Sequence, residues 1–370
     1  MKILQLGKTY PLIGGVDKVI FELSKGISQR EIQCDVLCAS IDNKNHEVVS
    51  NKYSTFFVTK SFRKIAATWI SPQMIFKLRG IVHNYDIIHI HHPDPMAALA
   101  LLFSNTKGKK IVLHWHSDIV KQKLLLKFYN PLQNWMIRRA DNIIATSSIY
   151  AQGSRYINKY VDKTIIIPIG VEVNYGVLSG LKKQINNKYV GKKIIYSLGR
   201  LCYYKGFEYL IDSAKYLDES YVILIGGTGP LVNKLSEKIE HANIGHKVKL
   251  LGKIADNEMG TYFSECTLFC FPSIEKSEAF GIVQIEAMSF GKPIIATTIK
   301  DSGVSWVNKH GYSGLNVEPR NSQELANAIK NICENDVVLN QYSLNARQRF
   351  EDEFTSDKMI DRILKLYDSF

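Results

Sequence analysis

Apolar runs of strand length alternate with segments of helical spacing along almost the whole chain, and this alternation restricts the possible folds. The runs are near-continuously apolar, which is typical of parallel strands covered by helices on both faces. Two such strands joined by a helix form a βαβ unit. The expected strands are 2–6, 34–40, 86–92, 110–116, 142–148 and 165–170 in the first half, and 193–199, 221–227, 247–252, 267–273 and 292–298 in the second.

The alternation is interrupted once, between the two halves. Residues 173–192 are polar, contain three glycines and show no clear period, so we expect an inter-domain linker there. It separates a first domain, residues 1–172, from a second domain, residues 193–350. Residues 351–370 are expected to form an amphipathic helix that packs back toward the first domain. The predicted fold class is α/β, with two Rossmann-like doubly wound domains that face each other across a deep cleft.

Composition narrows the class of protein. Apolar residues make up 45% of the chain and charged residues 22%, as in a folded globule with sizeable cores. The N-terminal segment lacks the features of a signal peptide, and its apolar run is too short to span a membrane. Six cysteines without an export signal indicate reduced thiols. We therefore expect a cytoplasmic protein.

The positive charge is concentrated in the first half. Residues 1–172 contain 23 Lys and Arg against 12 Asp and Glu, a balance of +11, whereas the remaining 24 and 23 give +1. The first half is therefore expected to face an anionic partner, such as nucleic acid, a phospholipid surface or a lipid pyrophosphate. The chain shows no recognisable nucleic-acid module, so a nucleic-acid partner is not predicted.

Two carboxylates eight positions apart stand in the stretch SEAFGIVQIEAM, residues 277–288. Glu286 falls inside an apolar helix expected to begin near Gly281, where an unpaired buried carboxylate would cost several kcal/mol. Glu278 precedes that helix in a loop whose successive N–H groups are suited to binding an anion. A sugar–diphosphate–nucleoside fits this pattern, because it is anionic in the middle and rich in hydroxyls at both ends. The alternative is a core helix in which Glu286 pairs with a structural Lys or Arg.

A second feature of the same domain favours an anionic ligand. The stretch GRLCYYKG, residues 199–206, follows the expected strand 193–199 and opens the next helix. Arg200 offers a planar fork of donors and Lys205 a point charge, a pair suited to a diphosphate. Gly199 permits close approach of the backbone. Taken alone, the two cations would be read as a solvated surface, but both features lie on loops that follow strands of one domain.

These motifs resemble those of the retaining GT-B glycosyltransferases of family 4. The spacing of Glu278 and Glu286 resembles the family's E-x7-E motif, and Arg200 with Lys205 its G-R-x(n)-K-G motif. PLIGGVDKVIFELSKGI resembles its Gly-Gly loop and first helix, HWHSD its His segment, and IPIGVE its pre-linker segment. Ala279 stands where the family frequently has Gly, and Ile169 where it frequently has Asn.

The resemblance implies a role for each matching residue. Glu286 would bind ribose hydroxyls, and Glu278 would bind hydroxyls of the donor sugar. His116 would lie beside the transferred sugar, with its ring near a hydroxyl and its carbonyl near the anomeric carbon. The implied donor-binding residues are Gly14, Gly15, Arg200, Lys205, Glu278, Ala279, Phe280, Gly281, Ile282 and Glu286, and the implied catalytic residues are His116, Glu278, Arg200 and Lys205.

The resemblance also implies a donor and a stereochemical course. The donor would be a UDP-, GDP- or other nucleotide-diphospho-sugar, and transfer would retain the anomeric configuration by front-face attack. No Asp-x-Asp motif occurs in the chain. Because two cations and a helix N-terminus can stabilise a departing diphosphate, no divalent metal is expected. Alternating histidines at 89, 91, 92, 114 and 116 leave zinc as an alternative, although hydrogen-bonding histidines fit better.

Two basic segments with aromatic residues bear on the acceptor. They are residues 60–82 and 121–139, and both could contact anionic lipid, unless each is an ordinary amphipathic helix with a solvated basic face. In family 4 the first domain receives the acceptor. A basic acceptor domain suggests a glycan acceptor linked to polyprenyl pyrophosphate or another lipid, at the inner face of a membrane. Assembly of O-antigen, capsule or lipopolysaccharide is the favoured context.

Other functions remain open from the sequence. A GT-B sugar-nucleotide epimerase, a phosphorylase with a pyridoxal cofactor and a non-catalytic sugar-nucleotide binder share the expected fold. GGTGP, residues 226–230, suggests a dinucleotide-dependent oxidoreductase only weakly, because Val232 occupies the position of the third glycine of that fingerprint.

Overall fold

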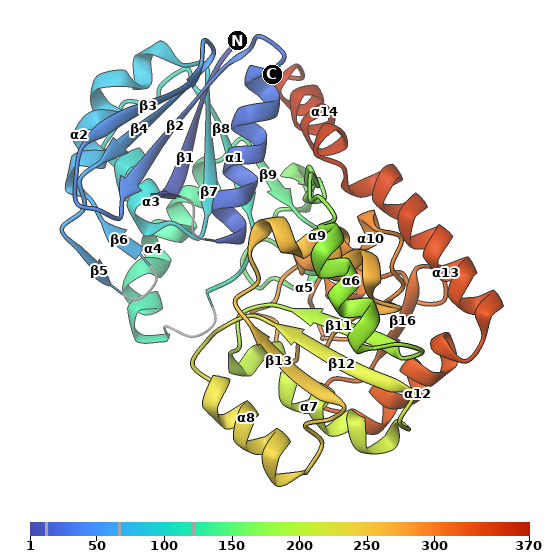
Figure 1. The fold of residues 1–370 in the computed structure, drawn as a ribbon. Coiled ribbons are helices and arrows are strands. Elements are labelled where there is room, and N and C mark those ends of the chain that lie inside the picture. The colour runs from blue at the N-terminus through green and yellow to red at the C-terminus, as the bar shows by residue number, and fades with distance from the viewer. Residues whose placement is uncertain (12–13, 66–67, 120–122) are drawn as a thin grey trace. The chain divides into compact units, whose positions relative to one another are not determined.

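The structure is a computed structural model that describes residues 1–11, 14–65, 68–119 and 123–370. The chain forms two compact units (Figure 1). The first unit comprises Met1–Glu172 and Thr355–Phe370, and the second comprises Val173–Phe354. Each unit contains one large sheet.

The sheet of the first unit has the strand order β10-β9-β8-β7-β1-β2-β4-β3. All neighbouring pairs are parallel except β3 and β4, which are antiparallel. The strands are β1 (Lys2–Tyr10), β2 (Gln33–Ser40), β3 (His46–Asn51), β4 (Ser54–Thr59), β7 (Ile87–His92), β8 (Lys110–Trp115), β9 (Asn142–Ala145) and β10 (Thr164–Ile166). A separate hairpin pairs β5 (Arg63–Ile65) with β6 (Thr68–Ile70).

The helices of the first unit connect these parallel strands. They are α1 (Gly15–Ser28), α2 (Pro72–Ile81), α3 (Pro95–Leu102), α4 (Lys123–Arg139) and α5 (Ser148–Gly153), together with α14 (Ser356–Tyr367) from the end of the chain. Asp94 caps α3 by accepting hydrogen bonds from the N–H groups of Met96 and Ala97. Polar caps of this kind satisfy donors that a helix start leaves free.

The sheet of the second unit is parallel throughout and has the order β13-β12-β11-β14-β15-β16. Its strands are β11 (Lys193–Leu198), β12 (Tyr221–Gly226), β13 (Val248–Gly252), β14 (Leu268–Phe271), β15 (Ile294–Thr297) and β16 (Gly314–Val317). Its helices are α6 (Ser179–Lys188), α7 (Phe207–Ser213), α8 (Val232–His241), α9 (Asp256–Glu265), α10 (Ile282–Ser289), α11 (Val304–Val307), α12 (Ser322–Cys333) and α13 (Asp336–Arg349). A buried core joins the sheet to α7 and α12 through residues such as Leu210, Ile225 and Ile329. Two doubly wound α/β units, as the sequence predicts, are therefore present.

The strand order reverses once inside each sheet. In the second unit β11 pairs with β12 on one side and with β14 on the other. In the first unit β1 lies between β2 and β7. Ligands of doubly wound folds bind at such switch points, outside the carboxyl ends of the strands. In such folds the binding residues stand on the loops at these edges, which here are the loops after β11 and β14 and those after β1, β7 and β8.

Both ends of the second unit differ in detail from the boundaries expected from the sequence. The expected linker, 173–192, contains α6, whose Ile185 is buried, and it is grouped with the second unit. Residues Phe350–Phe354 form a π-helical turn before α14.

In the first unit α14 packs against α1 at Gly26, where an added Cβ would lie 1.9 Å from the side chain of Ile360. Glycine at this position allows the two helices to approach closely.

Candidate active site

The loop after β11 carries the two predicted cations of the second unit. Arg200 follows Gly199 and is exposed, and the 3₁₀ turn Tyr203–Lys205 comes next. The loop enters α7 through Gly206, which has φ 66° and lies against the main chain of the loop after β14. Only glycine adopts this conformation at little cost, so the turn holds Lys205 at the carboxyl end of the sheet.

Lys205 and Glu278 form an ion pair at the switch point of this sheet. The distance from Lys205 Nζ to Glu278 Oε2 is 2.5 Å, and only 13% of each side chain is exposed. The ammonium group also lies 4.7 Å from the ring centroid of Phe271, at the end of β14. Two of the predicted site residues, 73 positions apart in the chain, are thus brought together. A charged pair with so little exposure is desolvated and therefore costly unless it is well paired.

The loop between Glu278 and α10 is held by the second unit itself. Ser302 Oγ donates to the carbonyl of Glu278 at 2.5 Å, and the N–H of Gly303 donates to the carbonyl of Ala279 at 2.9 Å. Gly281 has φ 83° and begins α10. No hydrogen bond from the N–H groups of Phe280, Gly281 or Ile282 is found in the part of the chain that the structure describes. Free N–H groups at a helix start, together with the helix dipole, can bind an anion.

Glu286 lies on the buried side of α10. It is 6% exposed, and its Oε1 accepts a hydrogen bond from the hydroxyl of Tyr175 at 3.0 Å. This partner was missed by the sequence reasoning, which placed Tyr175 in a linker. No local signal marks the contact, because it joins residues 111 positions apart. One partner of Glu286 is thus a hydroxyl.

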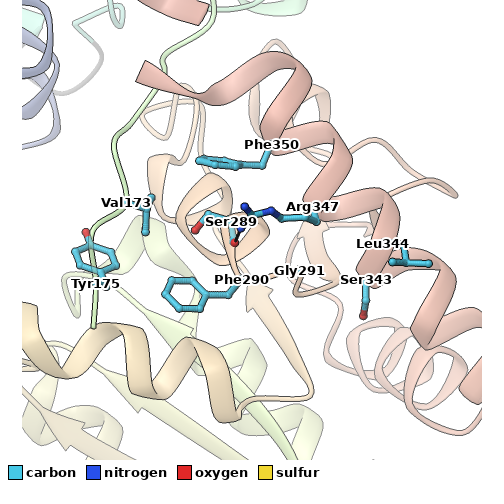
Figure 2. A pocket seen from close by; sticks show the side chains of 9 residues that line it. All are labelled: Val173, Tyr175, Ser289, Phe290, Gly291, Ser343, Leu344, Arg347 and Phe350. Atoms are coloured by element: carbon cyan, nitrogen blue, oxygen red, sulfur yellow. Dashed lines mark hydrogen bonds between the residues drawn. The ribbon is translucent and has the colours of Figure 1, made fainter. Parts of the chain in front are cut away.

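A pocket of about 640 Å³ opens at the other end of α10, away from Gly281 (Figure 2). Its lining contains none of the site residues predicted from the sequence. Figure 2 shows Arg347 reaching from α13 toward Ser289, whose carbonyl accepts a hydrogen bond from the guanidinium group. Tyr175 borders the pocket and also contacts Glu286, so it is the link between the two regions. The lining residues are Val173, Tyr175, Ser289, Phe290, Gly291, Ser343, Leu344, Arg347 and Phe350.

His116 follows β8 in the first unit and belongs to a buried group of histidines. Its N–H donates to the carbonyl of His92 at 3.0 Å, which continues the pairing of β7 and β8 by one residue. Because side chains alternate along a strand, His89 and His91 share one face of the sheet with His114 and His116. The rings of His114 and His116 stack at 4.1 Å. Burial lowers the pKa of all five histidines, and that of His114 falls to about 3.

Three of these histidines have the spacing of a metal site. The nitrogen atoms of His89, His91 and His114 lie within 4.8 Å of one another. Most of these atoms already have hydrogen-bond partners, however. Both nitrogens of His91 are bonded, to Gln5 and to His116, and both nitrogens of His89 are bonded, to Tyr367 and to His114. His114 Nδ1 is bonded to His89, whereas His114 Nε2 is buried and has no hydrogen-bond partner among the described residues.

Gly14 and Gly15 begin α1, close to the carboxyl end of β1. The N–H of Gly14 donates to Asp17 Oδ2 at 3.1 Å, and Thr9 donates to the same carboxylate. A Cβ at Gly14 would meet only Asp17 Oδ2, at 3.7 Å, which is an ordinary contact. The packing of the protein itself therefore does not require glycine at this position. The preceding Leu12 and Ile13 of the expected Gly-Gly loop lie outside the described residues.

Some basic side chains of the two basic segments are already paired within the protein. Lys77 pairs with Glu47 at 2.9 Å, and Arg139 donates to Asp141 and to the carbonyl of Thr106. By contrast, Phe76 of α2 is 68% exposed and Phe128 of α4 is 86% exposed. Residues 66–67 and 120–122 of the expected basic segments lie outside the described residues. Within the described residues, no helix is both long and apolar enough to cross a membrane.

Two doubly wound units, with a cation–carboxylate pair and a free helix start at one switch point, have the architecture of the GT-B glycosyltransferases. The sequence matches two family models, "Glycosyltransferase Family 4" over residues 13–175 and "Glycosyl transferases group 1" over residues 180–349. It is 34% identical over 369 residues to the O-antigen chain mannosyltransferase C of Escherichia coli, covering 99% of this chain and 98% of the relative. The chain belongs to the family 4 glycosyltransferases.

Other relatives and solved structures agree with this membership. The D-rhamnosyltransferase WbpZ of Pseudomonas aeruginosa is 29% identical over 359 residues, which cover 96% of this chain and 93% of that protein. The crystal structure of Anabaena HepE in complex with UDP superposes with a TM-score of 0.80 at 21% identity, covering both chains completely. These findings confirm the GT-B fold and the glycosyltransferase class predicted from the sequence.

Proposed function

We propose that the chain is a retaining, metal-independent transferase that moves a hexose from a nucleotide-diphospho-sugar to a hydroxyl of a glycan acceptor. The observation that carries the proposal is the ion pair of Lys205 and Glu278 beside the free start of α10. It combines a group for the phosphates and a group for sugar hydroxyls at one switch point. The second unit then binds the donor, and the first unit binds the acceptor.

Cleavage of a sugar–phosphate bond leaves negative charge on the diphosphate. Lys205 and the exposed Arg200 would stabilise that charge, together with the N–H groups of Phe280, Gly281 and Ile282. Preorganised donors and cations of this kind act in place of a divalent metal. Glu278 would exchange its bond to Lys205 for hydroxyls of the donor sugar, and Glu286, already bonded to Tyr175, would accept ribose hydroxyls.

The remaining donor contacts come from the first unit. Among the described residues, no neighbouring side chain fills the space beside Gly14, so a ligand could lie close to the main chain of Gly14 and Gly15. His116 would lie beside the transferred sugar. In front-face attack, a diphosphate oxygen would take the proton of the acceptor hydroxyl, so no protein base is required.

The names of the relatives suggest the donor sugar. HepE has been crystallised with UDP and with UDP-glucose, and the two relatives named above transfer mannose and D-rhamnose by name. D-rhamnose is 6-deoxymannose, so both sugars have the manno configuration. We propose a donor sugar of that configuration carried on a nucleoside diphosphate.

A screen of sugar nucleotides tests the proposal. The melting temperature of the protein is measured with mannose, rhamnose, glucose and galactose nucleotides. The true donor should raise it most, because ligand binding stabilises the folded state. Transfer to an acceptor with excess chelator should proceed at the same rate, and NMR of the product should show the anomeric configuration of the donor. Loss of transfer in chelator would contradict metal independence, and an inverted product would contradict retention.

The same assays separate the rival functions. A sugar-nucleotide epimerase would convert the donor without any acceptor, and a non-catalytic binder would raise the melting temperature without turnover. Either result, obtained with a range of acceptors, would overturn the proposed transfer reaction.

We further propose a lipid-linked acceptor at the inner face of a bacterial membrane. One relative acts by name on a sugar joined to diphosphoundecaprenol, and another on the O-antigen chain. The exposed Phe76 and Phe128 lie on helices with basic residues, a combination that binds anionic lipid surfaces. Flotation with anionic vesicles should decrease for Phe128→Ser but not for Val190→Ser, a residue 76% exposed in the second unit. Equal flotation of the two variants would contradict the proposed contact of Phe128 with the membrane.

A further inference from the structure

His116 is one end of a buried hydrogen-bonded chain that begins at Gln5 of β1. His91 Nε2 lies 2.9 Å from Gln5 Oε1, and His91 Nδ1 lies 2.9 Å from His116 Nε2. Gln5 and His91 are completely buried, and His116 is 5% exposed. The other ring nitrogen of His116, Nδ1, is buried and has no hydrogen-bond partner among the described residues.

The orientation of the Gln5 amide determines the direction of every bond in this chain. Gln5 Nε2 donates to the carbonyl of Ile20 at 3.3 Å and lies 3.3 Å from Cys34 Sγ. A carbonyl oxygen can only accept, so the NH₂ group must face Ile20 and Oε1 must face His91. An amide oxygen also can only accept, so His91 Nε2 must carry the proton that it donates to Gln5.

The same reasoning continues to His116. Burial lowers the pKa of His91 and His116 well below the usual value, so both rings are neutral and each carries one proton. With its proton on Nε2, His91 must accept at Nδ1, so His116 Nε2 must be the donor of that bond. His116 Nδ1 then has no proton, and its lone pair is unsatisfied in the described structure.

We propose that Gln5 and His91 are positioning residues that hold His116 in the Nε2–H form, so that its Nδ1 accepts a hydrogen bond from a hydroxyl of the bound sugar. This inference rests on the proposed function, which places a sugar beside His116. It specifies what that function leaves undefined, namely that the ring accepts a hydrogen bond from the ligand hydroxyl rather than donating one. An unpaired buried acceptor is costly, and a ligand hydroxyl would satisfy it.

A second chain of hydrogen bonds in the cluster does not reach His116. Tyr367 of α14 contacts His89 Nδ1, and His89 Nε2 lies 3.2 Å from His114 Nδ1. His114 stacks on His116 but has no hydrogen bond with it among the described residues. The proton positions of His116 are therefore determined through Gln5 and His91.

The tautomer can be measured directly on the protein without substrate. In ¹⁵N-histidine-labelled protein, the ring nitrogen shifts distinguish a protonated from an unprotonated nitrogen, and the His116→Asn variant assigns the His116 signals. We expect Nε2 protonated and Nδ1 unprotonated at neutral pH. The reverse assignment would overturn the proposal.

Gln5→Met removes the acceptor while keeping the volume and burial of the side chain. His91 is then free to place its proton on Nδ1 and to reverse the bond to His116, so a second tautomer of His116 should appear in the spectrum. Transfer should fall roughly 10- to 100-fold in kcat/KM, because a fraction of the enzyme presents a donor where an acceptor is needed.

Gln133→Met is the matched control. Gln133 is a completely buried glutamine of α4 in the same unit, and it has no hydrogen-bond partner among the described residues. Its replacement should leave both the His116 tautomer and kcat/KM unchanged. If Gln5→Met shifts the melting temperature but neither the tautomer nor kcat/KM, the role of Gln5 is structural and the proposal fails.

The two levels of inference fail in different ways. If no sugar nucleotide binds or reacts, the proposed function fails, whereas the measured tautomer still tests the assignment. If transfer occurs and Gln5→Met changes the tautomer without changing kcat/KM, the contact between Nδ1 and the sugar hydroxyl is wrong while the proposed function stands.

Discussion

Gly206 decides at the scale of a single residue whether the Lys205 loop can form. Its φ is 66°, and an added Cβ would lie 2.1 Å from the carbonyl oxygen of Pro272. We expect Gly206→Ala to destabilise the second unit by more than the ~1–2 kcal/mol of left-handed backbone strain alone, because the main chain after β14 must also move. The free energy of unfolding in urea measures this loss.

Gly252→Ala is the control that separates the cost of the left-handed backbone from the cost of the steric overlap with Pro272. Gly252 has φ 74°, and an added Cβ there would have no atom within 4 Å. The Gly252→Ala variant should therefore lose only the free energy of unfolding that corresponds to the left-handed backbone strain. Equal losses for the two variants would show that the contact with Pro272 is not significant.

Lys205→Met tests the ion pair of the candidate active site. The change removes the cation and leaves Glu278 largely buried without its partner, so the KM for the donor should rise and kcat should fall, together by about 100-fold in kcat/KM. Steady-state kinetics with the identified donor provide the measurement. Lys253→Met, at an exposed lysine of the same unit, should have no effect. Similar kinetics for Lys205→Met and the native protein would remove Lys205 from the site.

Local chemistry made part of the site predictable from the sequence. Arg200, Lys205, Glu278 and Gly281 stand on loops after strands, where their residue types already indicate binding of an anion. The hydroxyl that Tyr175 supplies to Glu286 was not predictable, because the contact depends on folding of the segment around α6 onto the second unit.

At the scale of elements, β7 and β8 should make the first unit sensitive to acid. Burial lowers the pKa of the histidines on and next to these strands. Below about pH 6.5, the pKa of histidine in the unfolded chain, the unfolded chain therefore binds protons that the folded unit does not bind. Stability is complete above about pH 6.5 and is lost as pH falls, by up to ~1.4 kcal/mol per pH unit for each histidine. The histidines are His89, His91, His92, His114 and His116.

The second unit is an internal control for this effect. Its histidines, His241, His246 and His310, are all exposed. Urea unfolding followed at pH 7.5, 6.5 and 5.5 should therefore show a falling midpoint for the first unit and a nearly constant one for the second. Asp94 and Glu22 act in the opposite direction, since burial raises the pKa of both, that of Asp94 to about 7, but they are two groups against five. A first-unit midpoint that does not change with pH would refute the prediction.

The elements were predicted unequally well. Parallel strands buried on both faces, such as β12 and β14, appear in the sequence as uninterrupted apolar runs. Strands β3, β4 and β16 were not among the expected strands; β3 alternates between half-buried and exposed residues and contains few apolar ones. Helices α3 and α9 were not expected either, although their caps are local: Asp94 caps α3, and Glu258 accepts from the N–H of Ala255 at the start of α9.

At the scale of the whole molecule, the end of the chain completes the first unit. Helix α14 buries Met359, Ile360, Ile363, Leu366 and Tyr367. Each such side chain contributes about 1.5–3 kcal/mol, so their sum is comparable to the ~5–15 kcal/mol that stabilises a typical domain. Deletion of residues 355–370 should therefore unfold the first unit. Limited proteolysis with mass spectrometry should show it digested while the second unit survives.

Deletion of only Ser369 and Phe370 is the control, because both residues are exposed and follow α14. This shorter variant should resist protease as the full chain does. A first unit that survives the longer deletion would show that α14 is not required for its folding.

The sequence by itself determined the doubly wound class and the glycosyltransferase family, and it predicted the residue types of the candidate anion-binding loops, because these follow from apolar runs, glycines and charges that are close together in the chain. The tertiary structure alone decided that Lys205 pairs with Glu278, that Tyr175 donates to Glu286 and that Gln5, His91 and His116 form one buried chain of hydrogen bonds. The physical reason is that these contacts join residues tens of positions apart, and only the register of the sheets and the packing of helices on them bring such residues within hydrogen-bond distance.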